Sequence, residues 1–367
     1  MIAGAHRILI VAPSPPPSGG MALQALLLRR LLQEDGAEVS FLASNFDLPS
    51  PFQRMPGIRT ILRFLLIWVH LWREVPRVAV VHVFAASQFY FFATVFPAIL
   101  VGCLFGKRTV LNYRGGAAGL FFRTWGLAIR PIFRAATVVT TPSDFLGELI
   151  RETFGVRVSI VPNILDTSTF RFRQRTKFGP RLLVNRNLEK IYDVESVLHA
   201  YREILRSNSD ASLWIVGSGS DEERLRGLAA LWDLAGARFL GHVDHADLPV
   251  LFEDRDILLN ASTIDNFPAA LLEGSAAGLA VVSTKAGGIP FVYQNEKTAL
   301  LVEVGDWQGL ASAVDRIVRD PSLGSRLTKE GNMLAEGCAW KEVRVPLYEA
   351  YSLAFHVNTP EIVAGGR

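Results

Sequence analysis

Residues 256–284 read DILLNASTIDNFPAALLEGSAAGLAVVST. Two short apolar runs, DILLNAS and AVVST, enclose a segment that can form a helix, and this order predicts two parallel strands joined by a helical crossover. Asn266 can cap a helix that opens at Phe267 and Pro268. The backbone N–H groups of such a first turn would form an anion site for a diphosphate. The stretch therefore predicts an α/β fold with a phosphate-binding helix.

The same alternation continues in both directions along the chain. Apolar strand-like runs are separated by segments with helical spacing, such as MALQALLLRRLLQ at 21–33 and DVESVLHAYREILRS at 193–207. This order predicts doubly wound parallel sheets, and the number of runs predicts two Rossmann-like lobes rather than one. The runs are RILIVA, VSFLA, VAVVHVF, RTVLNY, TVVTTP, VSIVPN, PRLLVN, SLWIVG, ARFLG, DILLNAS, AVVST and ALLVE.

A lobe boundary is expected near FRFRQRTKFGPR at 170–181, which is basic, lacks apolar periodicity and contains a Gly-Pro pair. We therefore expect an N-terminal lobe over 1–172 and a C-terminal lobe over 173–340. The remaining residues, 341–367, begin with a helical pattern, and we expect this last helix to return to the first lobe. The length of 367 residues suits two domains of about 150–200 residues.

Two acidic residues follow the strand DILLNAS. Asp265 comes first and Glu273 follows eight residues later. Glu273 could accept hydrogen bonds from ribose hydroxyls while Asp265 faces a sugar; an isolated pair of this kind would more simply be a cap-region acid and a solvated helix residue. The turn Gly217-Ser218-Gly219 after SLWIVG lacks the third glycine of the dinucleotide fingerprint, since Glu222 stands there. That departure argues against a nicotinamide-dependent oxidoreductase.

The order of these motifs resembles the family-4 glycosyltransferases, which are retaining enzymes of the GT-B fold. The signature of that family is an acid, seven residues, a glutamate, an apolar strand and a Gly-Gly turn, as in Asp265-x7-Glu273 and AGLAVVSTKAGGIP here. The resemblance extends over residues 7–350 and is strongest over 161–306. Its other segments are VPNILDTSTF, LLVNRNLEKIYDVESVLHAY, GHVDHADLPVLFEDRDILLNAS and KTALLVEVGD. It implies two Rossmann-like lobes that face a central cleft.

The resemblance also implies roles in the second lobe. Arg186 matches the arginine that stabilises the charge of a departing nucleoside diphosphate. Glu273 matches the glutamate that holds the nucleotide ribose, and Asp265 stands where the family usually has glutamate. Lys190 or Tyr192 takes the place of a phosphate-binding lysine. Further donor contacts are expected from Gly19, Gly20, Gly217, Ser218, His242, Val243, Asn266, Phe267, Pro268 and Ala269.

The first lobe is expected to bind the acceptor. Arg114 and Gly115 follow the strand RTVLNY, where many members of the family have histidine and glycine, and an arginine there suits a phosphate or a sugar. Ser143 follows VVTTP and is expected either to contact the acceptor or to cap the next helix.

No metal and no cofactor are expected. The pair His242-x-x-His245 lacks a third ligand, and no Asp-x-Asp motif occurs. The substrate is expected to be a UDP- or GDP-linked sugar whose phosphates are held by Arg186, backbone and a helix terminus. Two widely spaced cysteines and an N-terminal run that reads as a strand rather than a signal peptide indicate a reducing cytoplasm.

Charge is unevenly distributed in the first half of the chain. Between Asp47 and Asp144 the sequence has one acidic residue, Glu74, and eleven lysines and arginines. This suggests an anionic lipid or a phosphorylated acceptor, and the absence of a nucleic-acid-binding motif argues against DNA or RNA. The segment 59–77 suits a helix in a membrane interface or one packed on its own domain. The uncharged segment 89–105 is expected to be a buried crossover helix rather than a membrane span.

Together these features predict a retaining glycosyltransferase that acts on a cell-envelope glycan or a lipid-linked acceptor, in the cytoplasm or peripherally on the inner face of the cell membrane. Two alternatives share the fold. One is a hydrolase or epimerase of nucleotide sugars, and the other is a non-catalytic scaffold that binds them.

Overall fold

The computed structural model describes residues 7–15, 19–46, 48, 56–116 and 118–356. The chain forms two compact units: unit 1 comprises Met1–Ile164 and Val343–Arg367, and unit 2 comprises Leu165–Glu342. The division lies before the expected position at 172, because Leu165 already belongs to unit 2, where its N–H donates to the carbonyl of Cys338 at 2.8 Å. Of the expected tail at 341–367, residues 357–367 lie outside the described part.

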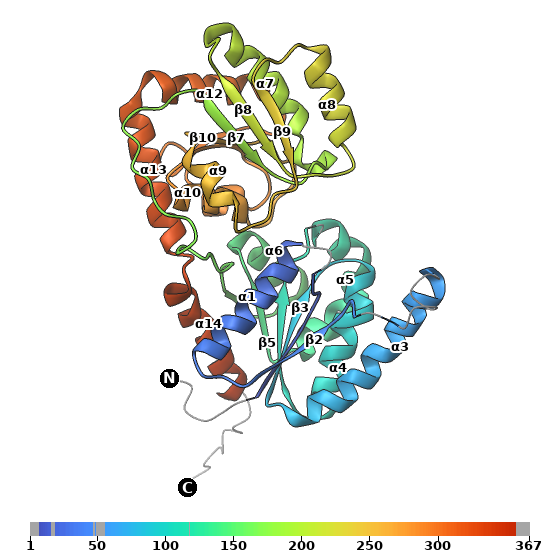
Figure 1. The fold of residues 1–367 in the computed structure, drawn as a ribbon. Helices are drawn as coiled ribbons and strands as arrows, with labels where there is room; N and C mark the ends of the chain where they lie inside the picture. Colours follow the sequence, from blue (N-terminus) through green and yellow to red (C-terminus); the bar gives the residue numbers. More distant parts are fainter. Residues whose placement is uncertain (1–6, 16–18, 47, 49–55, 117, 357–367) are drawn as a thin grey trace. The chain divides into compact units, whose positions relative to one another are not determined.

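Unit 1 contains a six-stranded parallel sheet in the order β2-β1-β3-β4-β5-β6 (Figure 1). Every strand falls on one of the predicted apolar runs. The strands are β1 (Ile8–Ala12), β2 (Val39–Ala43), β3 (Val80–Ala85), β4 (Arg108–Tyr113), β5 (Val138–Thr141) and β6 (Val158–Ile160). The helices are α1 (Gly20–Glu34), α3 (Pro56–Glu74), α4 (Phe96–Leu104), α5 (Ala118–Ala135), α6 (Asp144–Phe154) and α14 (Trp340–His356).

The two faces of this sheet are covered by different helices. Leu9, Val11, Val81 and Val83 face a large apolar cluster with α3, α4, α5 and α6. On the other face, the C-terminal helix α14 contacts the sheet through Tyr351, whose hydroxyl lies 2.8 Å from Nδ1 of His82 on β3. Helix α14 thereby completes unit 1 through the contact of Tyr351 with β3.

Unit 2 contains a second six-stranded parallel sheet, in the order β12-β11-β10-β7-β8-β9. Its first strand pairs with its fourth, so the direction of winding reverses between β7 and β10, as in a Rossmann fold. The strands are β7 (Arg181–Asn185), β8 (Ser212–Val216), β9 (Ala237–Gly241), β10 (Ile257–Asn260), β11 (Ala280–Thr284) and β12 (Leu300–Val302). The helices are α7 (Val194–Ser207), α8 (Glu222–Leu231), α9 (Leu248–Glu253), α10 (Ala269–Ala276), α11 (Ile289–Val292), α12 (Trp307–Arg319) and α13 (Pro321–Glu336).

Both faces of the second sheet are buried, which explains why its strands are apolar at successive positions. Leu182 and Val184 of β7 face a cluster that includes α7, α8 and α12. Leu183 faces the opposite cluster, which includes α9, α10 and part of α13 (Figure 1). The fold prediction of two doubly wound parallel α/β lobes is therefore confirmed.

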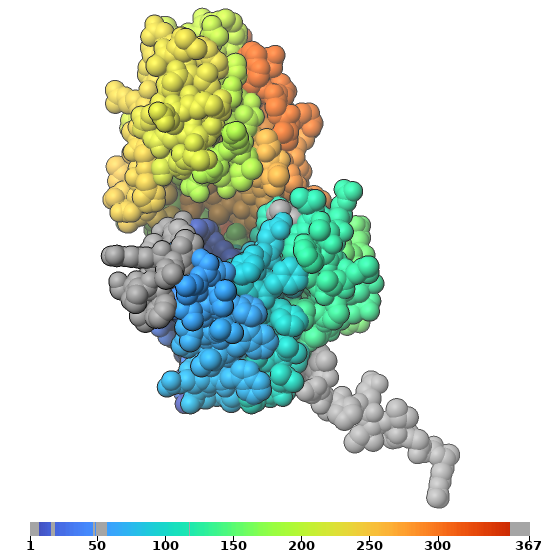
Figure 2. Space-filling model, turned by 90° about the vertical axis from the view of Figure 1, so that its right-hand side faces the viewer, coloured from blue at the N-terminus to red at the C-terminus, as the bar shows by residue number. Residues whose placement is uncertain are grey.

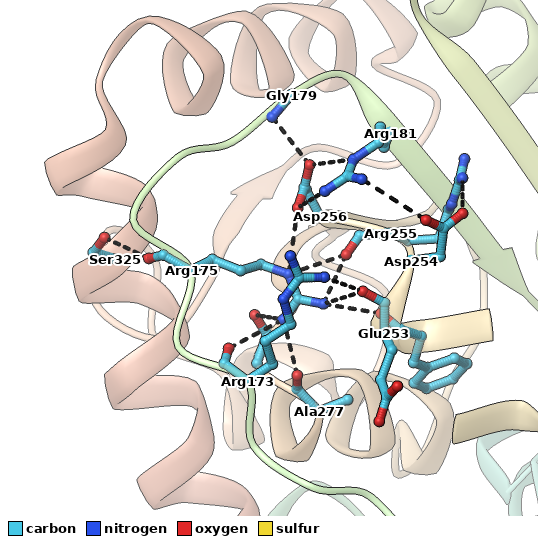
Figure 3. Close-up of polar contacts among 12 residues, drawn as sticks. Arg173, Arg175, Gly179, Arg181, Glu253, Asp254, Arg255, Asp256, Ala277 and Ser325 are labelled. Atoms are coloured by element: carbon cyan, nitrogen blue, oxygen red, sulfur yellow. Dashed lines mark hydrogen bonds and ion pairs between the residues drawn. The ribbon is translucent and has the colours of Figure 1, made fainter. Parts of the chain in front are cut away.

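A buried arginine ties the segment that enters unit 2 to the base of this sheet. Arg175 and Asp256 lie 3.4 Å apart with almost no exposed side-chain surface. The guanidinium of Arg175 donates to carbonyls at the C-terminal ends of α9 and α10, while Arg181 binds Asp256 through two hydrogen bonds of 2.8 and 3.0 Å (Figure 3). The carbonyl acceptors of Arg175 are those of Phe252, Glu253, Arg255, Arg173, Ala277 and Gly278. Helix C-termini carry partial negative charge, so one cation stabilises both ends.

The two apolar segments of unit 1 are both helical. Residues 91–95 form one turn of π-helix that continues into α4, and α4 is largely buried between β3, β4 and α5. In the described part of the chain, no helix has the length and apolar character needed to cross a bilayer. The segment 59–77 forms most of α3 and a short 3₁₀ turn at Val75–Arg77.

Candidate functional site

The carboxyl ends of β7 and β10 meet at the winding reversal of unit 2. In open α/β sheets this is where ligands bind, because helices from neighbouring strands leave in opposite directions there. Arg186 follows the last residue of β7, and Asn260 is the last residue of β10. The resemblance placed Arg186, Asp265 and Glu273 in one site, and the sheet order brings the elements that carry them to this edge.

Arg186 and Asp265 form an ion pair at the carboxyl edge of the sheet. Nη2 of Arg186 lies 2.6 Å from Oδ2 of Asp265, and both side chains are largely buried. Nε donates to Oδ1 of Asn260 at 2.9 Å, and the guanidinium lies 5.3 Å from the ring centroid of Tyr192. Among the described residues Nη1 of Arg186 makes no hydrogen bond. The guanidinium is thus held on one edge by protein groups and has donors left for an anion.

A buried network of hydrogen bonds holds the side chain that accepts from Nε of this arginine. Oδ1 of Asn260 also accepts from Oγ of Ser262 at 2.7 Å, and its Nδ2 donates to Oγ of Ser283 at 2.9 Å. All three side chains are buried. Buried polar groups are costly unless they are hydrogen-bonded, so the network fixes the orientation of Asn260 and, through it, of Arg186.

The turn between β10 and α10 differs from the expected one. Asn266 was predicted to cap a helix opening at Phe267–Pro268, but α10 begins at Ala269 and Pro268 occupies the cap position. Two physical reasons explain the shift. Oδ1 of Asp265 accepts the N–H of Phe267 at 3.1 Å, which forms a local turn, and a residue before proline disfavours the helical conformation. Helix α10 still begins only four residues after Asp265, the partner of Arg186.

Glu273 lies on α10 and is held by two residues outside that helix. Oε1 lies 3.1 Å from Nε2 of His245, and Oε2 accepts from Nδ2 of Asn185 at 3.5 Å. The carboxylate raises the pKa of His245, an effect that burial opposes and Asp166 reinforces. His245 also packs edge-on against Phe170, with ring centroids 5.5 Å apart.

Glycines allow three loops to approach one another at this site. A Cβ on Gly217 would lie 2.0 Å from the carbonyl oxygen of Arg186, and the φ of Gly217 is +127°. Cβ atoms on Gly287 and Gly288 would lie 2.3 Å from the carbonyl oxygen of Asp265 and 2.2 Å from that of Asn266. Only glycine fits at these positions. The Gly-x-Gly and Gly-Gly turns therefore position the backbone that carries the Arg186–Asp265 pair.

The remaining predicted donor residues of unit 2 lie on the connections that follow β7, β8 and β9. Lys190 and Tyr192 lie on one 3₁₀ turn, where Tyr192 faces the guanidinium of Arg186 and Lys190 is exposed. The carbonyl of Ser218 accepts the N–H of Leu188 at 3.0 Å. His242 is exposed and lies 3.6 Å from Asp244 in the loop after β9. Val243, on the same loop, packs against the apolar cluster beside α9 and α10.

In unit 1, Gly19 and Gly20 lie at the start of α1. Gly19 caps the helix with an ordinary φ of −99°, and a Cβ at either glycine would meet no atom within 4 Å. The fold itself therefore does not require glycine there. Gly115 differs, because a Cβ would lie 2.4 Å from Oγ of Ser87.

Arg114 lies beside a small pocket within unit 1 lined by Phe84, Asn112, Pro162 and Leu347, among others. Its guanidinium donates to the amide oxygens of Asn112 and Asn163 and lies 4.7 Å from the ring centroid of Phe84. Burial lowers its pKa to about 9, which still leaves it charged at neutral pH. Arg114 is thus a fixed cation at the carboxyl edge of the first sheet.

Beneath Arg114, the Nδ2 of Asn112 lies 3.0 Å from Nε2 of His82, and His82 in turn contacts Tyr351 of α14. Burial and the nearby Arg114 lower the pKa of His82 to about 3, so the imidazole is neutral. Ser143 lies at the cap position of α6, but its side chain makes no capping hydrogen bond, and among the described residues its Oγ is buried without a partner.

Three residues of the site were not singled out from the sequence. Asn185 and Asn260 end apolar strands, and a polar residue at the carboxyl end of a buried strand is the signal that could have found them. His245 was treated only as a loop residue, and nothing in its neighbourhood in the sequence indicates contact with Glu273. Within the described ranges, no three His, Cys, Asp or Glu side chains are grouped so that they could hold a metal ion.

Comparison with known proteins matches both halves of the chain to glycosyltransferase families. Residues 18–169 match the family described as Glycosyltransferase Family 4, and residues 168–333 match that described as Glycosyl transferases group 1. A glycogen synthase of Mycobacterium tuberculosis is 27% identical over 230 residues, which are 61% of this chain and 56% of that protein. The lipopolysaccharide core biosynthesis glycosyltransferase LpsE of Rhizobium meliloti is 31% identical over 137 residues, 37% of this chain and 40% of that protein. The chain thus spans about half the length of the curated relatives it matches.

A solved structure gives the fold. HepE of Anabaena, crystallised in complex with UDP and glucose, superposes with a TM-score of 0.73 at 16% identity, over 95% of this chain and 99% of that one. Each unit described above is a Rossmann-like half of this GT-B fold. With both halves of the chain matched in order, this protein belongs to the family-4 glycosyltransferases.

Proposed function

We propose that this protein transfers a sugar from a UDP- or GDP-linked donor to a hydroxyl group of a cell-envelope glycan or a lipid-linked acceptor, with retention of anomeric configuration. The observation that carries the proposal is the arrangement of Arg186. Its guanidinium is oriented by Asp265 and Asn260, retains free donors and lies at the winding reversal, next to the N-terminus of α10.

This arrangement suits departure of a nucleoside diphosphate. As the bond between the anomeric carbon and the β-phosphate oxygen breaks, the electron pair stays on the phosphate, and a preorganised guanidinium stabilises that charge without reorientation. The helix terminus adds partial positive charge. The acceptor oxygen then bonds to the anomeric carbon on the same face, and its proton leaves with the released phosphate. Glu273 would hold the ribose, and no metal is required by this scheme.

The acceptor side of the proposal rests on unit 1. Arg114 is a partly buried cation beside a pocket, and the surrounding sequence is strongly basic, so a phosphate-bearing or lipid-linked acceptor fits its charge. One similar protein carries a name from lipopolysaccharide core biosynthesis, which supports an envelope glycan as the acceptor. We infer that the protein works on the cytoplasmic side of the membrane.

The first test is thermal stability of the purified protein with UDP, GDP or ADP. One nucleotide at about 100 times its dissociation constant should stabilise the folded protein by about 2.7 kcal/mol. Glu273→Ala should abolish this shift, because the mutant loses the ribose contact, whereas Glu296→Ala, which removes an exposed carboxylate of the same unit, should keep it. No shift with any nucleotide would contradict the proposed donor site.

Product analysis then separates the reaction types. Transfer to an added acceptor with little turnover in its absence supports a transferase. Rapid, stoichiometric donor breakdown without any acceptor would instead indicate a hydrolase or epimerase, and binding with no turnover would indicate a scaffold.

Nucleotide affinity should depend on pH through His245. His245 binds the Glu273 carboxylate, which the ribose would also use, and the hydrogen bond to Glu273 is the main cause that raises the pKa of His245 above its ordinary value. Glu273 and Asp166 are the charged groups that face it, and both favour the protonated imidazole. Deprotonation weakens the hold on Glu273, so affinity should rise as the pH increases through the raised pKa.

Calorimetric titration with the nucleotide selected by the stability test checks this expectation. His245→Gln should bind with an affinity that is nearly independent of pH in that window. His199→Gln, which changes a histidine on α7, should keep the slope of the wild-type protein. A wild-type affinity that falls as the pH rises would show that His245 attracts the diphosphate instead of competing with the ribose.

A further inference from the structure

Helix α3 presents apolar side chains on both of its sides. Ile67 and Leu71 point into the core of unit 1 and are buried. Ile58, Ile61, Leu65, Val69 and Trp72 recur at spacings of three and four residues on the opposite side and are all exposed, with Ile61 at 62% and Val69 at 59%. A helix packed only on its own domain needs one apolar face. The second stripe therefore has no role in the core of this unit.

The exposed stripe continues onto α4 and α5. Trp72 of α3 packs edge-on against Phe105 at the end of α4, with ring centroids 5.0 Å apart, and Phe92 before α4 packs against Trp125 of α5 at 5.2 Å. The three helices lie side by side on the face of unit 1 shown in blue, cyan and teal in Figure 2. Leu104, Leu120 and Leu127 add exposed apolar side chains, and Leu127 is 84% exposed.

The charge of this face is almost entirely positive. In the segment from Pro56 to Ala135, which holds all three helices, Glu74 is the only acidic residue. Apart from Arg114 at the edge of the sheet, the lysines and arginines of this segment are Arg59, Arg63, Arg73, Arg77, Lys107, Arg108, Arg123, Arg130 and Arg134. An apolar surface mixed with cations and tryptophans matches the interface of an anionic bilayer, where apolar side chains enter the acyl boundary and cations meet the lipid headgroups.

We propose that the α3–α4–α5 face of unit 1, defined by these exposed apolar residues and by these exposed or partly exposed basic residues, docks on the surface of a membrane that contains anionic lipid. The helices lie in the plane of the interface with Ile61, Leu65, Val69 and Trp72 inserted, and none of the described helices crosses the bilayer. This inference deepens the proposed function, since it would bring unit 1 to a lipid-linked acceptor. It does not depend on the chemistry in unit 2.

The test is sedimentation of the full chain with vesicles, without any sugar nucleotide. Vesicles of phosphatidylcholine with about one third phosphatidylglycerol should bind the protein, and pure phosphatidylcholine should bind it at least tenfold more weakly, because each cation near an anionic surface contributes about 1 kcal/mol. The double substitution Ile61→Glu with Leu65→Glu should reduce binding to the anionic vesicles about tenfold or more. Both positions are exposed, so the fold should tolerate the change.

A matched control adds the same charge elsewhere. Leu231→Glu with Met333→Glu changes two exposed apolar residues of unit 2, and this variant should bind vesicles like the wild type. Equal losses in both double variants, or no preference for anionic vesicles, would overturn the proposal. Weak vesicle binding together with a dimer that the α3 substitutions dissociate would instead identify a second copy of this chain as the occupant. The nucleotide stability shift, measured on the same samples, tells a failure of docking from a failure of the donor site.

Discussion

Replacing Arg186 with alanine should lower the rate of sugar transfer by about 10²–10³-fold, which corresponds to about 2.7–4 kcal/mol of transition-state stabilisation. The expected cause is loss of a fixed cation at the departing diphosphate. Because Asp265 and Asn260 orient the guanidinium through their own contacts, the wild type spends little energy to place it. The effect should therefore appear in kcat as well as in kcat/KM, measured with the donor that the stability test selects.

Two further variants test this explanation of the Arg186→Ala effect. Arg186→Lys keeps the charge but not the planar donors, so it should recover only part of the rate. Arg316→Ala removes an exposed arginine of the same unit that pairs with Glu296, and it should transfer sugar at the wild-type rate. Since Arg186→Ala leaves the largely buried Asp265 unpaired, its thermal stability must be measured too. A well-folded alanine variant with a rate within threefold of the wild type would show that Arg186 does not act on the leaving group.

Replacing Arg175 with methionine should destabilise unit 2 by about 3–5 kcal/mol, the cost usually found when one partner of a buried charge network is removed. The methionine fills most of the volume but donates nothing. Carbonyl groups of Phe252, Arg255, Ala277 and Gly278 would each lose a donor, and the carboxylate of Asp256 would keep only Arg181 and the N–H of Gly179 (Figure 3). Urea denaturation followed by circular dichroism should show the loss as a lower midpoint.

Arg173→Met is the control for this substitution. Arg173 belongs to the same segment and contacts one carbonyl, that of Glu253, but its side chain is exposed. The change should cost less than about 1 kcal/mol, as exposed polar contacts usually do. Similar losses for both variants would mean that the segment tolerates the missing donors by relaxing, and that the buried network contributes little to stability.

The architecture was predictable from the sequence because both sheets are buried on two faces. Each strand then reads as a short apolar run, such as RLLVN at 181–185, and each of the twelve predicted runs contains one strand of the structure. The position of the division between the units was harder to predict from the sequence. It depends on the hydrogen bond between Leu165 and Cys338, which are far apart in the sequence and carry no local signal.

The site was predictable only where its residues follow a local rule or a family pattern. Arg186, Asp265 and Glu273 stand at positions set by the ends of strands and by one helix, so the resemblance could single them out as candidates, and the structure pairs Arg186 with Asp265. The start of α10 was predicted too early, because the side chain of Asp265 takes the N–H of Phe267. Contacts between loops escape such rules altogether, as His245 shows, because they depend on how two turns meet in space. The need for glycine at position 217 also could not be predicted, because it arises where this turn meets the carbonyl group of Arg186.

One feature of the chain path bears on how such proteins diversify. Unit 2 begins at Leu165 and ends at Glu342, and Leu165 is paired with Ala339 through a β-bridge, so the two ends of this unit lie next to each other. Unit 1, in contrast, needs both ends of the polypeptide, since α14 completes it. In chain order, unit 2 is a domain inserted between the two segments of unit 1. Residues 165–342 could therefore be exchanged for those of a relative by two cuts at neighbouring points, which would leave unit 1 unchanged.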